Sequence, residues 1–198
     1  MKAVSRRTLL KGALASCLPL TFPSVVLSEE EKEQGRDRVD RLVPGRASQA
    51  SSRPIVGIHP GATWPAKRWL PERFAALIDM VRAKLGGDIV VTGGPKDDAT
   101  VREVIRLAHA EVAVAGPLSL RELAGVLGQL SVFVTNDAGP MHIAAAVGTP
   151  TIGLFGPGQE DIWFPYAADE GHTALRRDVP CHPCHLDVCD RPGEEHMR

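Results

Sequence analysis

Hydrophobic and polar positions alternate in blocks along residues 54–198, and the blocks predict strands that alternate with helices. Short apolar runs predict buried strands, and apolar residues at helical spacing predict amphipathic helices. The expected strands are residues 55–58, 88–92, 112–115, 132–134 and 151–154. The expected helices are residues 71–85, 97–110, 119–130 and 139–147. This order predicts an α/β domain with a parallel sheet, right-handed crossovers and helices on both faces.

Residues 1–28 differ in character from this domain. They carry Arg6 and Arg7 ahead of an apolar run, which resembles a twin-arginine export signal. Pro19 and Pro23 interrupt the run, however, and no clear cleavage site follows. The alternative interpretation is the remnant of a longer N-terminal domain or a misplaced start.

A charged helix and a linker are expected at residues 29–53. Ser28 is a suitable N-cap, with Glu31 at the capping-box position, for a solvated helix that ends at Leu42. A Pro-Gly pair ends this helix, and a Ser/Ala/Gln-rich stretch leads into the domain at residues 54–198, which closes with a Cys/His-rich tail.

Composition narrows the classes of protein. With 198 residues, 43% hydrophobic and 24% charged, the chain can bury one good core rather than two full α/β domains. The net charge of −1 leaves no electrostatic footprint for nucleic acid. Nothing after Ser28 approaches the ~18 apolar residues that a membrane-spanning helix needs.

Four loops follow the carboxyl ends of the expected strands, where ligands of parallel sheets bind. They begin at His59-Pro-Gly, Thr92-Gly-Gly, Asn136-Asp and Phe155-Gly-Pro. Within residues 136–157 a glycine-containing turn opens an Ala-rich helix. Free backbone N–H groups and the positive end of a helix dipole then suit a diphosphate. The sequence therefore predicts a diphosphate-binding site, and the resemblance described next implies that its ligand is a sugar nucleotide.

Several motifs in this order resemble the donor half of the family-9 glycosyltransferases, the ADP-heptose:lipopolysaccharide heptosyltransferases. The motifs are Asp137-Ala-Gly-Pro-Met-His142, Ala144-Ala-Ala-Val-Gly-Thr-Pro150, Leu154-Phe-Gly-Pro157, His59-Pro-Gly-Ala and Lys67-Arg-Trp69. The resemblance covers about residues 54–189. It implies the Rossmann-like C-terminal domain of a GT-B enzyme, which binds a nucleotide sugar such as ADP-heptose and needs a separate domain for the lipopolysaccharide core acceptor.

The same resemblance implies transfer with inversion and without a metal or other cofactor. The base that deprotonates the acceptor belongs to the N-terminal domain of such enzymes, so we expect donor binding but little turnover from this chain alone. Family members continue with a closing helix beyond the position of Arg198. The alternatives are a non-catalytic nucleotide-binding fragment, or an exported protein with a structural metal or disulfide in its tail.

Three side chains are the candidate catalytic residues. Lys67 is placed to reach a phosphate oxygen and to stabilise the leaving diphosphate; the alternative is a solvent-exposed lysine beside Arg68. Asp137 is assigned to hydroxyls of the donor sugar, or to an Asx-type turn that shapes its own loop. His142 donates to a phosphate oxygen or braces the Asp137 loop; the alternative is an ordinary core or surface histidine.

Further candidates bind the donor through backbone or ribose contacts. Gly61 and Gly94 allow close approach of a ligand because no Cβ intrudes. Asp97 accepts from ribose hydroxyls, or else Asp97 or Asp98 caps the following helix. The backbone N–H groups of Ala138, Gly139 and the residues after Pro140, beginning with Met141, are assigned to the diphosphate. Pro140 suits the first helical position, where its missing N–H costs nothing.

The tail contains Cys181, Cys184 and Cys189 together with three histidines. This spacing fits a structural zinc or a disulfide of Cys181 with Cys184, but we assign it no catalytic role and predict no metal in the active site. An ADP-sugar is a cytoplasmic metabolite, so the resemblance implies a cytoplasmic protein at the inner face of the inner membrane. Export by a twin-arginine signal is the alternative.

Overall fold

The computed structural model of the chain describes residues 24–44, 53–184 and 186–190. The twin-arginine-like motif, most of the expected linker and the last eight residues lie outside the described residues. Six strands are present: β1 (Ile55–His59), β2 (Asp88–Thr92), β3 (Ala113–Ala115), β4 (Val132–Asn136), β5 (Thr151–Phe155) and β6 (Thr173–Arg176). The helices are α1 (Glu29–Leu42), η1 (Pro65–Lys67), α2 (Pro71–Leu85), α3 (Asp98–Leu107), α4 (Leu120–Leu127), α5 (Gly139–Ala146), α6 (Glu160–Trp163) and η2 (Ala168–Glu170).

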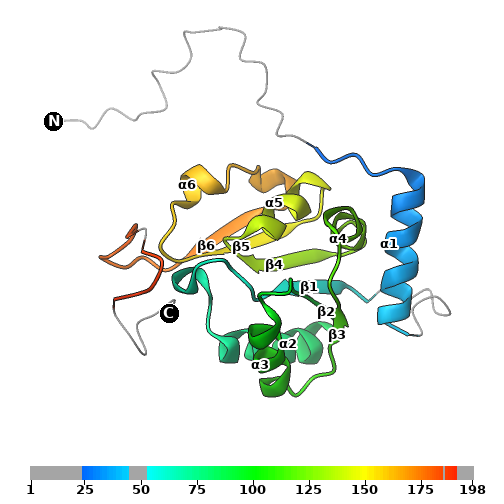
Figure 1. The fold of residues 1–198 in the computed structure, drawn as a ribbon, viewed down its shortest axis with the longest axis horizontal. Coiled ribbons are helices and arrows are strands. Elements are labelled where there is room, and N and C mark those ends of the chain that lie inside the picture. The colour runs from blue at the N-terminus through cyan, green and yellow to red at the C-terminus, as the bar shows by residue number, and fades with distance from the viewer. Residues whose placement is uncertain (1–23, 45–52, 185, 191–198) are drawn as a thin grey trace, which may run out of the picture.

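The strands form one parallel sheet in the order β3-β2-β1-β4-β5-β6 (Figure 1). The predicted parallel α/β fold is therefore confirmed, with a sixth strand that we did not predict. β1 pairs with β2 on one side and with β4 on the other, so the order of the chain reverses between β1 and β4. In open α/β sheets this reversal marks the edge where ligands bind, outside the carboxyl ends of the strands.

Helices cover both faces of the sheet (Figure 1). Successive side chains of a strand point to opposite faces, and β1 follows this rule. Ile55 packs in a cluster with Val39 of α1 and Leu127 of α4, whereas Val56 packs in a second cluster with Phe74 of α2. An apolar cluster thus packs against each face of the sheet. The loops at its carboxyl edge are therefore attached to a well-packed core.

The predicted capping box of α1 is present, and α4 begins with a second one. The Ser28 hydroxyl accepts from the backbone N–H of Glu31, and the Glu31 carboxylate accepts from the N–H of Ser28. Ser119 and Glu122 repeat this arrangement at the start of α4. The α2 helix ends at Leu85. Its C-cap residue, Gly86, has a φ of 60°, a left-handed backbone conformation that favours glycine.

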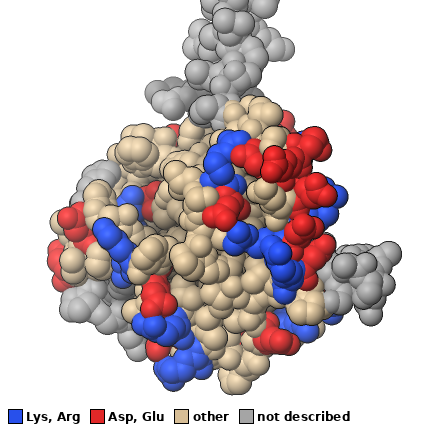
Figure 2. Space-filling view, turned by 45° about the vertical axis from the view of Figure 1, so that its right-hand side comes forward, with Lys and Arg blue, Asp and Glu red and all other residues tan. Residues whose placement is uncertain are grey.

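The α1 helix is more than a solvated helix, because one of its faces packs against α4. Gly35 and Gly125 allow the two backbones to touch: a Cβ on Gly35 would lie 2.3 Å from the carbonyl oxygen of Gly125. Val39 is buried beside this contact, and Arg38 pairs with Glu122 at 2.5 Å. The outer side of the molecule near α1 carries interspersed acidic and basic side chains (Figure 2). The charge pattern correctly predicted a solvated outer face of α1, but it gave no sign of the face that packs against α4.

The tail lies over part of the sheet face that α2 and α3 leave open. A cavity of about 400 Å³ remains there, and it is lined by Leu77 of α2, by Ile152 and Leu154 of β5, and by Cys181 and His182 of the tail, among others. Within the described part of the chain, no helix combines the length and the apolar character needed to cross a bilayer.

Candidate functional site

Lys67 and Asp137 meet at the carboxyl edge of the sheet. Lys67 ends η1 in the loop after β1, and Asp137 directly follows β4. Their side chains pair at 2.5 Å between Nζ and Oδ2, and they retain only 18% and 6% of their exposure. The ammonium also lies 4.8 Å from the centre of the Trp64 ring, a cation–π contact. The pair is therefore a largely buried ion pair at the switch point of the sheet.

The turn around Asp137 is closely packed. A Cβ on Gly158, in the Gly-Pro-Gly loop after β5, would lie 2.7 Å from Asp137 Oδ2. α5 begins two residues later, with Ala138 in extended conformation at the N-cap position. Ala138, Gly139 and Pro140 thus stand at the mouth of the helix, where the first backbone N–H groups have no partner within the helix.

Met141 differs from the rest of this helix start. Its N–H donates to the Ala138 carbonyl at 3.0 Å, and its side chain is fully buried with Phe155 and Phe164. Met141 therefore anchors the first turn of α5 in the core, and its N–H is already used within that turn.

His142 lies one turn into α5, close to the ion pair. Its Nδ1 is 2.5 Å from the hydroxyl of Tyr166. Burial lowers the pKa of His142; the charge of Asp137 opposes this shift, and the charge of Lys67 adds to it. The imidazole is consequently neutral at pH 7 and keeps one N–H to donate.

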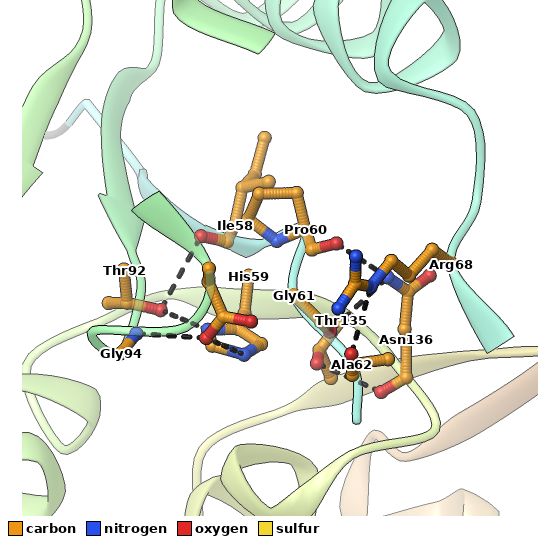
Figure 3. Close-up of polar contacts among 11 residues, drawn as sticks. Ile58, His59, Pro60, Gly61, Ala62, Arg68, Thr92, Gly94, Thr135 and Asn136 are labelled. Carbon is orange, nitrogen blue, oxygen red and sulfur yellow. Dashed lines mark hydrogen bonds and ion pairs between the residues drawn. The ribbon is translucent and has the colours of Figure 1, made fainter. Parts of the chain in front are cut away.

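A second polar cluster lies at the ends of β1 and β2 (Figure 3). The buried His59 ring is 3.1 Å from the Thr92 hydroxyl, and its other nitrogen is 3.8 Å from Asp97 Oδ2. Asp97 accepts from the N–H of Gly94 at 2.9 Å, and a Cβ on Gly61 would lie 2.3 Å from the Asp97 carboxyl group. Asp97 occupies the N-cap position of α3 but makes no capping bond. Its carboxylate instead points toward the loops that contain Gly61 and Gly94.

The loop between these clusters, residues 60–69, is tied to the end of β4. The side chain of Asn136, itself fully buried, donates to the carbonyls of Pro60 and Gly61 (Figure 3). Its oxygen accepts from the N–H of Trp69. Both ends of the loop that carries Lys67 thus converge on one amide.

The structure therefore brings Lys67, Asp137 and His142 together at the start of α5. It places Gly61, Gly94 and Asp97 in the neighbouring cluster. Residues for which the sequence suggested no role also shape the site: they are His59, Trp64, Asn136, Gly158 and Tyr166. His59 and Asn136 stand in loops already singled out, but their partners lie far away in sequence.

The cysteine-rich tail contacts two of the loops that form the site. The N–H of Ala66 donates to the carbonyl of Asp187, and the His182 ring donates to the carbonyl of Gly158 at 2.7 Å. Cys181 and Cys184 are not disulfide-bonded. Among the described residues, no three His, Cys, Asp or Glu side chains gather as metal ligands.

Known proteins are similar to this chain in sequence and in fold. The chain is 42% identical over 150 residues to the lipooligosaccharide heptosyltransferase 2 of Haemophilus influenzae, which covers 72% of this chain and 42% of the relative. The structure of the E. coli ADP-heptose LPS heptosyltransferase II superposes with a TM-score of 0.67 at 27% identity, over 83% of this chain and 48% of that one. A glycosyl transferase family 9 structure from Veillonella parvula gives 0.68 at 28% identity, over 79% and 44%.

These matches confirm the expected resemblance and the Rossmann-like fold of a GT-B glycosyltransferase domain. The chain spans less than half the length of these relatives. The sequence profile of glycosyltransferase family 9 (heptosyltransferase) matches residues 3–192, which is nearly the whole chain. The chain therefore belongs to glycosyltransferase family 9.

Proposed function

We propose that this chain is the donor-binding part of a heptosyltransferase. It binds a nucleotide diphosphate sugar of the ADP-heptose class, and the sugar passes to a lipopolysaccharide core acceptor held by an acceptor-binding domain. The observation that carries the proposal is the meeting of Lys67 with the turn that opens α5. An ammonium and a set of helix N-terminal amides at one point make an anion site at the expected edge of the sheet.

Lys67 is assigned to the diphosphate. Its ammonium has three donors, so a phosphate oxygen can share it with Asp137. The charge of the ammonium becomes more valuable as the bond between the sugar and the diphosphate breaks, because negative charge then accumulates on the leaving group. Trp64 covers one side of the ammonium and limits its access to water.

Asp137 is assigned to hydroxyls of the donor sugar. A lone carboxylate beside a diphosphate would repel it, but the pairing with Lys67 offsets that charge. His142 completes the site if the Tyr166 hydroxyl donates to Nδ1, because Nε2 then carries the proton and can donate to a phosphate oxygen. The raised pKa of Tyr166, which burial causes, keeps its hydroxyl protonated.

The cluster around Asp97 is assigned to the nucleoside. Gly61 and Gly94 lack a Cβ, which lets the Asp97 carboxyl group lie against both of their loops. We assign this carboxylate to the ribose hydroxyls of the donor. The backbone N–H groups of Ala138 and Gly139, at the start of α5, complete the phosphate contacts, and Pro140 and Met141 shape the turn that presents them.

In the proposed reaction the acceptor oxygen attacks the anomeric carbon, the carbon–oxygen bond to the diphosphate breaks, and ADP leaves. The proton of the acceptor hydroxyl goes to a base in the acceptor-binding domain. We place the protein at the cytoplasmic face of the inner membrane, where a nucleotide sugar is available. A second candidate is a nucleotide-binding protein without turnover, because the anion site of Lys67 and the start of α5 serves binding with or without transfer.

Calorimetric titration with ADP and ADP-heptose tests the proposal. Loss of a charge-assisted contact of about 1.5–3 kcal/mol predicts that Lys67→Ala weakens ADP binding ~10- to 150-fold. Lys84→Ala, at the exposed end of α2, is the matched control and leaves binding unchanged. Asp137→Ala weakens ADP-heptose more than ADP if the carboxylate contacts the sugar. Equal affinity of the wild type and Lys67→Ala for ADP would disprove the assigned site.

A further inference from the structure

Asn136 closes the loop that carries Lys67. Its side-chain nitrogen lies 2.9 Å from the carbonyl oxygen of Pro60 and 3.3 Å from that of Gly61, and its oxygen lies 3.0 Å from the nitrogen of Trp69. The side chain is fully buried. One amide therefore uses two donors and one acceptor to join the first and last residues of a ten-residue loop.

Other polar contacts of the loop lie within it or reach the tail and Asp137. Arg68 Nε donates to the Ala62 carbonyl at 2.9 Å, the Ala66 N–H donates to the Asp187 carbonyl, and Lys67 pairs with Asp137. Trp69 packs edge-on against Phe74 of α2, with ring centres 5.0 Å apart. The Asn136 amide joins both ends of the loop to the end of β4, and an unpaired polar group at this depth would be costly.

Asn136 is also next to Asp137, the carboxylate that pairs with Lys67. It is the last residue of β4, and Asp137 follows it directly. The backbone N–H of Asp137 donates to Leu154 of β5 at 3.1 Å, so the end of β4 is itself fixed by the next strand. The end of β4 therefore contacts the loop twice: Asn136 bonds to the backbone at both ends of the loop, and Asp137 pairs with the Lys67 ammonium.

We propose that Asn136 is a positioning residue for Lys67: it holds loop 60–69 closed, so that the ammonium stands at the start of α5 before the donor arrives. It touches no ligand in this account and acts through the lysine. The proposal rests on the proposed function for its effect on binding, but its effect on the loop is independent of any ligand.

Two measurements on the full chain test this role. Hydrogen exchange followed by mass spectrometry reports the order of loop 60–69 in wild type, Asn136→Ala and Asn136→Asp. Calorimetry reports ADP binding for Asn136→Ala, Lys67→Ala and the double variant. Asn136→Asp keeps the acceptor for Trp69 but places an oxygen against the carbonyls of Pro60 and Gly61, so it opens the loop with little change in volume.

The matched control is Thr149→Val, which removes a buried hydrogen bond of 2.7 Å to the Leu127 carbonyl at the opposite end of the sheet. It reports the effect of a comparable loss of stability away from the loop. Thermal unfolding of all variants identifies any that fail to fold.

We expect exchange in loop 60–69 to rise in both Asn136 variants and to stay unchanged in Thr149→Val. We also expect Asn136→Ala to weaken ADP binding ~10-fold in the wild-type background but less than ~2-fold in the Lys67→Ala background, since residues that act as a unit are not additive. Unchanged loop exchange, or equal losses of affinity in both backgrounds, would overturn the proposal. If the loop opens as expected while the wild type binds no ADP, the proposed function fails and the loop anchor stands.

Discussion

Replacement of Lys67 by methionine tests the buried ion pair on which the site is built. Methionine keeps the apolar stem of the side chain and removes the charge, which leaves the Asp137 carboxylate buried without its partner. Removing one member of a buried pair costs about 3–5 kcal/mol. Because the Lys67 side chain keeps 18% of its exposure, we take the lower end and expect Lys67→Met to lower the free energy of unfolding by ~3 kcal/mol.

Lys67→Met is one arm of a double-mutant cycle, and the other arm removes the charge of the Asp137 carboxylate. Asp137→Asn leaves an ammonium that can still reach water, so we expect a smaller loss of ~1 kcal/mol. The double variant Lys67→Met/Asp137→Asn buries no unpaired charge. We expect its loss to be smaller than the sum of the single losses by ~2 kcal/mol, the usual size of coupling between residues in contact.

Urea denaturation at pH 7 and low salt, followed by far-UV circular dichroism, measures all four proteins. Equal m-values establish that the unfolding transitions are comparable. Additive losses within 0.5 kcal/mol, a margin typical of independent sites, would refute the reasoning, because they would mean that the two charges do not interact in solution.

Three further results are expected. Gly158→Ala places a Cβ 2.7 Å from Asp137 Oδ2, so it should lower stability by about 1–3 kcal/mol and weaken ADP binding in calorimetry. Gly35→Ala should separate α1 from α4 and destabilise by a similar amount in urea denaturation, although alanine normally favours a helix. Burial lowers the pKa of His59 in the folded state, so the unfolded chain binds more protons below about pH 6.5. The free energy of unfolding should therefore fall between pH 6.5 and pH 5, by at most ~1.4 kcal/mol per pH unit for this histidine.

Matched variants separate these effects from general damage. Gly116→Ala introduces a Cβ with no heavy atom within 4 Å and should leave stability and binding nearly unchanged. A Gly158→Ala protein with the same properties as Gly116→Ala would contradict the tight turn around Asp137. His59→Gln should flatten the pH dependence between pH 6.5 and pH 5, and an unchanged slope would assign that dependence to other groups.

The elements with strong local signals were predictable. The apolar run at residues 88–92 and the helical spacing at residues 71–85 predicted β2 and α2 with the bounds found in the structure. β6 was missed because it lies at the edge of the sheet and its residues are largely exposed. Such a strand has no continuous apolar run, and its pairing with β5 is a property of the fold.

The site was predictable where chemistry and local structure coincide. Lys67 and Asp137 stand in motifs whose loops must meet at one edge of a parallel sheet, and the structure places their charges in contact. The role of Asn136 could not be inferred, because its partners lie about 70 residues earlier in the chain. An amide at a strand end looks the same in sequence whether it caps a turn, faces water or closes a distant loop.

A crystal structure of the chain with ADP tests the central claim most directly. We expect the terminal phosphate within hydrogen-bond distance of both Lys67 Nζ and a backbone N–H at the start of α5, with the Asp97 carboxylate at the ribose. ADP bound elsewhere on the molecule, with the phosphates out of reach of both groups, would contradict the claim.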